Sequence, residues 1–298
     1  MRTSTAKGLM VSVILARSTS FLFSKTALAA MGLFELLGLR FFLAFLFLSL
    51  VYRKRLRASF GRDILLRGIL LGAVLYLVMA SEMMALKQSD IYLTAFLENS
   101  AFLFVPLILW VADRQKPSRR MLFFMAVMTA GVALLTLKGT DHWNGAAWGI
   151  AAAFFYGLFI FLTGKLAAKS DGISLGIWQM GVMGVLNLVS SAAVEEMKMP
   201  SGPETVVSLL ALTFLCSAFG FTFQTEAQKY ISTAEAGLFS ALDPLFATLW
   251  GMIFRGENPG PSGAAGALLV LIGMVGAQGR GKGLAALRHR TKGSADSV

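Results

Sequence analysis

Ten stretches of about 20 mostly apolar residues follow one another along this chain, separated by short connections that carry most of its charge. A helix of roughly 20 apolar residues is long enough to cross the hydrocarbon core of a bilayer. With 56% apolar and 14% charged residues, the chain has too few polar side chains to cover a soluble protein of its length. The sequence therefore predicts an all-α integral membrane protein with ten transmembrane helices, at 7–29, 33–52, 64–86, 90–112, 119–138, 144–167, 173–194, 205–226, 233–254 and 262–280.

Positive charge lies in alternate connections. Residues 53–62 and 114–120 are rich in Lys and Arg, whereas 29–33 carries no charge and 195–204 is net acidic. The positive-inside rule then places both termini in the cytoplasm, with the chain in the inner (plasma) membrane. The first apolar stretch is too long for a cleaved signal peptide, and the basic tail at 281–298 is expected to be disordered in the cytoplasm. On this interpretation the basic residues behind the net charge of +11 set the orientation of the chain in the membrane and do not indicate nucleic-acid binding.

The two halves of the chain carry a weak repeat. FLFSKTALA at 21–29 matches FLTGKLAAK at 161–169, and ALKQS at 85–89 matches AQKYI at 227–231. These matches align Lys25 with Lys165 and Lys87 with Lys229. Because each copy has an odd number of spans, the copies insert in opposite orientations, as in transporters that open alternately to either side. We expect one five-helix repeat in 1–139 and a second in 140–280, around a central cavity.

Three polar residues are expected near the membrane midplane. Arg17 lies about ten residues into the first span, and Glu98 and Asn99 lie at a similar depth in the fourth, which enters from the other side. An unpaired charge at this depth costs at least ~2.5–3.5 kcal/mol. We therefore expect Arg17 and Glu98 to pair or to share a water-filled cavity. The alternative is a static tie between the two helices.

Asp243 and Pro244 stand in the middle of the ninth span. The proline removes a backbone hydrogen bond, so the helix is expected to break there. Broken helices are tolerated at membrane depth where they line a cavity. Asp243 either hydrogen-bonds the backbone freed by Pro244 or contacts a substrate or a proton.

Tyr156, Trp178 and Gln179 offer aromatic and amide groups suited to an amphipathic organic solute. Trp178 has the alternative role of an interfacial residue. Arg40 and Glu82 are expected nearer the outer surface, Arg40 in a structural role and Glu82 shallow enough to reach the interface.

The sequence has neither an HExxH metal-binding motif nor a phosphate-binding loop. The single cysteine, Cys216, excludes an intramolecular disulfide. We therefore expect no enzymatic activity, no catalytic residue, no metal and no cofactor.

Residues 224–257 resemble the signature region of EamA-domain proteins of the drug/metabolite transporter superfamily. The resemblance rests on Gln224, Ala227-Gln228-Lys229, Ser232, Ala236, Ser240, Leu242, Pro244-Leu245-Phe246-Ala247, Gly251 and Glu257. It implies ten helices around a central cavity and, typically, export of amino acids or related metabolites. Family members often have Trp-Gly near the position of Arg17, so Arg17 is expected to be specific to this protein's substrate, an anion or carboxylate.

These observations predict a secondary transporter of small organic metabolites. It is expected to contact membrane lipids and to exist as a monomer or homodimer, with Glu98 and Asp243 as candidates for proton coupling. The alternative is a multidrug or toxic-cation efflux transporter. A membrane enzyme or lipid scramblase would need a catalytic constellation or an open polar groove, and the sequence shows neither.

Overall fold

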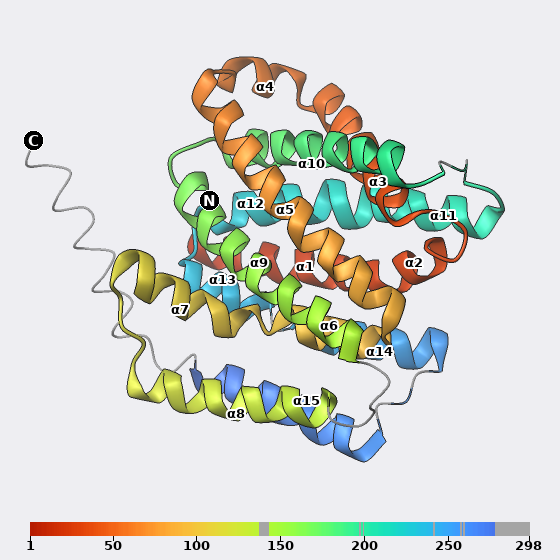
Figure 1. The fold of residues 1–298 in the computed structure, drawn as a ribbon. Coiled ribbons are helices and arrows are strands. Elements are labelled where there is room, and N and C mark those ends of the chain that lie inside the picture. Colours follow the sequence, from red (N-terminus) through yellow and green to blue (C-terminus); the bar gives the residue numbers. More distant parts are fainter. Residues whose placement is uncertain are drawn as a thin grey trace, which may run out of the picture.

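A computed structural model of the chain describes residues 1–136, 143–196, 198, 200–240, 242–256, 258 and 260–277. Across these ranges the secondary structure is helical and includes no strand, which confirms the all-α class (Figure 1). The helices are α1 (Thr3–Ser18), α2 (Ser20–Ala27), α3 (Leu33–Val51), α4 (Arg53–Ser59), α5 (Arg62–Gln88), α6 (Ile91–Asn99), α7 (Ala101–Asp113), α8 (Arg119–Thr136), α9 (Trp143–Ala167), α10 (Gly172–Val194), α11 (Pro203–Ala211), the π-helix η2 (Leu212–Phe221), α12 (Thr222–Gln228), α13 (Thr233–Ser240), α14 (Asp243–Arg255) and α15 (Gly260–Ala277).

Seven helical stretches of the described residues are long and apolar enough to cross a membrane. They are Thr3–Ala27, Leu33–Val51, Arg62–Gln88, Leu93–Asp113, Gly145–Ala167, Gly172–Val194 and Pro203–Gln228. The three other expected spans do not qualify by this measure. The stretch 233–254 is divided between α13 and α14, and the apolar part of α15 is the shorter Gly260–Gly273. The number of ten spans therefore remains a prediction.

Three of the long helical stretches are interrupted near their middle, and each interruption has a serine whose hydroxyl bonds back to a backbone carbonyl. Ser18 donates to the carbonyl of Leu15 where α1 meets α2, and Ser100 donates to the carbonyl of Leu97 where α6 meets α7. Such bonds compete with the backbone ladder. At the third interruption Ser240 donates to the carbonyl of Gly237. There Pro244, which has no N–H, lies in the first turn of α14.

The helices pack in pairs that bring distant parts of the chain together. α3 packs on α10, α5 on α9 and α10, and α8 on α15. In Figure 1, α8 and α15 run side by side along one edge, while α3, α5 and α10 lie toward the opposite side. The interrupted stretches α1–α2, α6–α7 and α13–α14 lie between these two groups (Figure 1).

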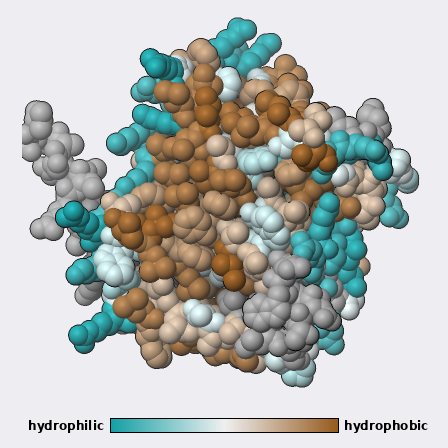
Figure 2. Space-filling view, viewed as in Figure 1, coloured by the Kyte–Doolittle hydropathy of each residue, from teal (hydrophilic) through white to brown (hydrophobic). Residues whose placement is uncertain are grey.

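Apolar side chains cover much of the outer surface. Figure 2 shows a broad hydrophobic area over this face, with hydrophilic side chains toward its margins. Leu50 and Val194 are each 69% exposed and Val111 is 83% exposed. A soluble protein rarely exposes a continuous apolar surface of this extent, so the surface is one suited to lipid.

Candidate solute-binding site

Arg17 lies at the centre of a buried polar cluster built from three helical segments. Its Nη1 donates to the hydroxyl of Tyr156 on α9 at 2.7 Å and to Oε1 of Gln224 on α12 at 2.6 Å. Its guanidinium carbon lies 4.3 Å from the centre of the Phe221 ring and 5.2 Å from that of Tyr156. Arg17 is only 5% exposed, so these contacts replace water around its charge.

The close approach of α1 to η2 depends on a glycine. A β-carbon at Gly220 would lie 2.7 Å from Cγ of Arg17, too near for any side chain. Gly220 therefore leaves room for the stem of Arg17 to reach Gln224. In the part of the chain that the structure describes, the hydrogen bonds of Arg17 use Nη1 alone, so Nε and Nη2 are available to a ligand.

A second group of buried polar residues comes from the two interrupted helices α6–α7 and α13–α14. Glu98 and Asn99 end α6, Asp243 begins α14, and all three are 1% exposed. The Asn99 side chain hydrogen-bonds the carboxylate of Asp243 and also donates to the carbonyl of Ala95. Neither carboxylate oxygen of Glu98 has a hydrogen-bond partner among the described residues, and Oδ1 of Asp243 is in the same position.

Arg17 and Glu98 are both buried, but they do not form a direct pair. Within the described ranges no ion pair joins the two, although Arg17 is near enough to act on Glu98 electrostatically. Tyr156 and Gln224 occupy the contact distance around Nη1 of Arg17 instead. Of the two arrangements expected from the sequence, the structure has a shared buried region rather than a salt bridge.

Arg40 and Glu82 belong to the same buried region, and their expected position near the outer surface is wrong. Each is 1% exposed. Arg40 donates from Nε to the hydroxyl of Ser217 at 2.6 Å, and its guanidinium lies over the ring of Phe41. Glu82 and Arg40 interact electrostatically, and Glu82 also acts on Glu98. Glu82 is buried because its side chain faces the protein interior, where it acts on Arg40 and Glu98.

Gln179 and Trp178 are neighbours in α10 but face different surroundings. Gln179 is fully buried and donates to the hydroxyl of Thr225, next to Gln224. Trp178 packs against the rings of Phe45 and Phe60, each 5.9 Å away, and is partly exposed. The structure thus brings Gln179 to the edge of the Arg17 cluster and places Trp178 in a separate aromatic group.

Four members of the cluster were not proposed as binding residues from the sequence: Arg40, Glu82, Phe221 and Gln224. A signal for two of them exists in the weak repeat. The match of Lys87 to Lys229 sets an offset of 142 residues, and the same offset aligns Glu82 with Gln224. Phe221 has no comparable signal, because it is one of 24 phenylalanines.

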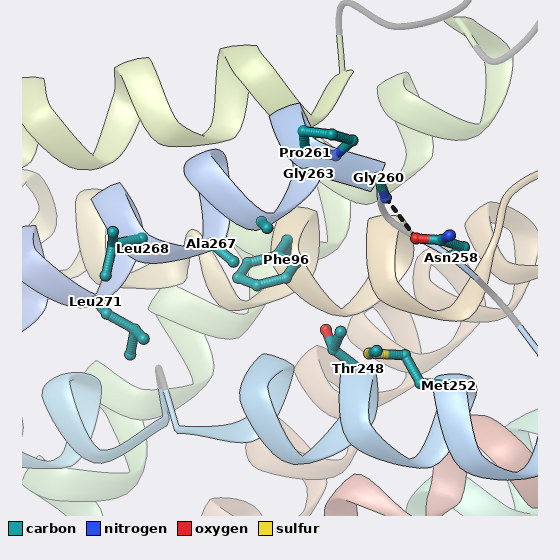
Figure 3. A pocket seen from close by; sticks show the side chains of 11 residues that line it. Phe96, Thr248, Met252, Asn258, Gly260, Pro261, Gly263, Ala267, Leu268 and Leu271 are labelled. Carbon is teal, nitrogen blue, oxygen red and sulfur yellow. Dashed lines mark hydrogen bonds between the residues drawn. The ribbon is translucent and has the colours of Figure 1, made fainter.

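A separate pocket of about 570 Å³ lies between α6, α14 and α15 (Figure 3). Phe96, Thr248 and Met252 form one side of it, and residues of α15 such as Ala267 and Leu271 form the other. Among the described residues its lining is mainly apolar and includes no charged side chain. It therefore does not match a site for a charged solute, and the Arg17 cluster remains the candidate.

Ionic contacts tie α3 and α10 together at both ends. Nε and Nη2 of Arg55, which follows α3, donate to the carboxylate of Asp171, the N-cap of α10, at 2.5–3.0 Å. At the other end, Glu195 accepts from the backbone N–H groups of Phe34 and Glu35 in the first turn of α3. Partial burial tends to raise the pKa of Asp171, but hydrogen bonds from Arg55 and Ser174 outweigh this effect and lower it.

No group of three or more His, Cys, Asp and Glu side chains in the described part of the chain is arranged to hold a metal ion.

Comparison with known proteins supports a transport role. Residues 143–277 match the family described as the EamA-like transporter family. Two proteins of Archaeoglobus fulgidus, each named an uncharacterized transporter, are similar over most of their length. One is 27% identical over 86% of this chain and 91% of the relative, and the other is 23% identical over 88% and 82%.

A solved structure, titled only as the crystal structure of a protein, superposes with a TM-score of 0.73. It is 18% identical and covers 97% of this chain and 99% of its own, a likeness that shows the fold alone. The family match confirms the resemblance found in residues 224–257. Residues 143–277, a little under half of the chain, are thus similar to the EamA-like transporter family.

Proposed function

We propose that this protein is a secondary active transporter that exports small organic metabolites, amino-acid-like solutes in particular, across the inner (plasma) membrane. The observation that carries the proposal is the buried guanidinium of Arg17, held by Tyr156 and Gln224 through Nη1 alone. Its Nε and Nη2 make no hydrogen bond within the described residues, and we assign them to a planar anion such as a carboxylate. A guanidinium that served only to hold helices together would be expected to use these donors within the protein.

The architecture we propose is ten spans in two inverted repeats, at 1–139 and 140–280. In this scheme α8, α13–α14 and α15 are the three spans in addition to the seven long helical stretches. The packing supports it, because contacts in one half have counterparts in the other: α5 packs on α9 as α1 and α2 pack on α11, η2 and α12. In the same way α6 and α7 pack on α9, and α13 and α14 pack on α1 and α2.

Alternating access is the mechanism that this arrangement favours. The charged members of the cluster are at most 5% exposed, so the site is closed to both sides in this conformation. The interrupted helices that carry Glu98 and Asp243 are suited to small movements about their breaks. Release on either side would require rearrangement of the α3–α10 pair or of its neighbours.

Transport in proteoliposomes tests the proposal. The purified full-length protein would be reconstituted and screened for counterflow of radiolabelled amino acids, organic acids and amines. We expect counterflow of at least one carboxylate-bearing solute, and its loss in Arg17→Met. Failure of every solute to exchange, with protein correctly inserted, would overturn the proposal.

Orientation is tested separately. If both termini lie in the cytoplasm, reporters that are active only in the cytoplasm should function when fused after Gly279. Reporters that are active only in the periplasm should not function there. The opposite result would refute the proposed insertion.

Multidrug or toxic-cation efflux is the second candidate. The buried acids Glu98 and Asp243 favour it, since unpartnered carboxylates attract cations. Arg17 separates the two candidates. A cation-efflux protein should transport lipophilic cations that lack a carboxylate, and Arg17→Met should leave that transport intact or increase it.

A further inference from the structure

The residues around Arg17, the group of Glu98, Asn99 and Asp243, and the pair of Arg40 and Glu82 together form one buried polar cluster, and this cluster holds an excess of negative charge. It contains two guanidinium groups, on Arg17 and Arg40, and three carboxylates, on Glu82, Glu98 and Asp243. All five are at most 5% exposed, and their charges act on one another. With every group ionised the cluster carries one uncompensated negative charge, an unfavourable state in surroundings of low dielectric.

Hydrogen-bond acceptors are in excess as well. Five buried oxygens of the cluster have no donor among the described residues: Oε2 of Glu82, Oε1 and Oε2 of Glu98, Oδ1 of Asn99 and Oδ1 of Asp243. Against them stand Nη1 of Arg40, a buried donor without an acceptor, and Nε and Nη2 of Arg17, which the proposed function assigns to the carboxylate of the solute. Buried polar atoms are normally satisfied, so an excess of acceptors indicates a missing group that supplies donors.

We infer that Glu98, with Glu82 beside it, forms a subsite for a protonated amino group of the transported solute. An ammonium group has one positive charge, three N–H donors and no acceptor. Its charge offsets the excess negative charge, and its donors supply the oxygens that lack a hydrogen bond. Glu98 is the main contact because both of its carboxylate oxygens lack a partner. The inference rests on the proposed transport function and narrows its substrate to a solute with a carboxylate for Arg17 and one net positive charge, as in a basic amino acid.

A proton is the competing occupant. Protonation of one carboxylate would also remove the excess charge, but it would supply one donor and leave the other orphaned oxygens as they are. The two occupants predict different ligand preferences. An ammonium subsite favours a solute with an additional amino group, whereas a protonated carboxyl shows no such preference.

L-lysine and L-norleucine form a matched pair of probes, because they share one carbon skeleton and differ by the terminal ammonium group. Apparent affinities for the purified full-length protein would be taken from the rise in unfolding temperature with ligand concentration. The variants are Glu98→Gln and, as a control, Glu204→Gln, which removes one acid from the exposed first turn of α11. We expect L-lysine to bind the parent and the control at least about tenfold more tightly than L-norleucine. In Glu98→Gln the preference should disappear.

The outcomes separate the alternatives. Equal binding of the two probes by the parent, or a preference that persists in Glu98→Gln, would overturn the ammonium subsite. Uptake of a proton from weak buffer on binding of L-norleucine, with no preference for L-lysine, would assign the site to a proton and also overturn it. Counterflow of a carboxylate-bearing solute in the same preparation would show that the proposed transport function stands even if the subsite fails.

Discussion

Replacement of Arg17 by methionine tests whether the guanidinium is the structural centre of the buried cluster. Methionine keeps most of the side-chain volume, so the change removes mainly the charge and two hydrogen bonds. A hydrogen bond to a charged group contributes ~1.5–3 kcal/mol, and the change leaves the Gln224 carbonyl without its donor and the Tyr156 hydroxyl with only the 3.5 Å bond from Nε2 of Gln224. It also leaves three buried carboxylates facing Arg40 alone. We expect a loss of about 3–5 kcal/mol in stability.

Two further variants make this expectation specific. Tyr156→Phe removes the hydrogen bond from Arg17 and a long one of 3.5 Å from Nε2 of Gln224 but no charge, so it should cost only about 1–2 kcal/mol. Glu98→Gln removes a carboxylate that has no hydrogen-bond partner, so it should leave stability unchanged or raise it. The double variant Arg17→Met/Glu98→Gln returns the net charge of the cluster to its original value and should recover part of the loss.

Labelling of Cys216 provides the assay. It is the only cysteine of the chain, it is fully buried, and it contacts α1 through Thr19 and the carbonyl of Ala16. A thiol reagent therefore reports opening of the region around Arg17. A loss of ~3–5 kcal/mol corresponds to a labelling rate roughly 10²- to 4 × 10³-fold faster, provided that closing is fast relative to labelling. Equal acceleration by Arg17→Met and Glu98→Gln would refute the reasoning, because it would show that the two residues stabilise each other as a direct pair.

Four further changes test other parts of the structure. Pro244→Ala restores a backbone N–H at the start of α14, so we expect transport to fall several-fold with insertion retained; unchanged counterflow would mean that the break is not needed. Arg55→Ala should destabilise the protein slightly, by less than about 1 kcal/mol, and high salt should reduce the difference from the parent. The pKa of Asp171 is lowered in the folded protein, so its contribution to stability is complete above the ordinary carboxyl pKa of about 4 and is lost as pH falls through the lower folded value. The difference in stability between the parent and Asp171→Asn should therefore become smaller in acid. A difference that became larger in acid would contradict this expectation. Gly184→Val would bring a β-carbon within 2.7 Å of the Phe42 backbone nitrogen, so it should separate α3 from α10 and lower the yield of folded protein, whereas Gly8→Val, at an open position, should not.

Much of the fold follows from features that a single sequence displays directly. Long apolar runs indicate helices that cross the membrane, and the Pro244 position indicates where one of them is interrupted. These features are local, because a helix satisfies its own backbone and proline acts on its own turn. The depth of a residue in the membrane likewise follows from its position within its own helix, which is why Arg17, Glu98 and Asp243 could be predicted to lie away from the membrane surfaces.

Which side chains contact each other depends on how distant segments pack, and the sequence predicts these contacts less well. The depth of Arg17 indicated an acid as partner, but the structure gives it Tyr156 and Gln224 from the other half of the chain. Arg40 and Glu82 were assigned to the outer surface from their distance to the end of a span. Distance along a helix gives depth but not the direction of the side chain, and both residues face the protein interior. Trp178 shows the converse, since a central position in the sequence pattern did not bring it to the cluster.

The proposed repeat offers a physical reason why its two copies have diverged at the cluster. An offset of 142 residues aligns Glu82 with Gln224, and an offset of 144 aligns Asn99 with Asp243. In each pair one copy has a carboxylate and the other has an amide. If both copies kept the acid, five carboxylates would face two guanidinium groups in a buried site, and the excess charge would oppose folding. The amides keep hydrogen bonds that acids would make, since Gln224 accepts from Arg17 and Asn99 bonds Asp243, but they add no charge. The asymmetry therefore leaves the site one negative charge from neutrality, a difference that a solute with one net positive charge can remove.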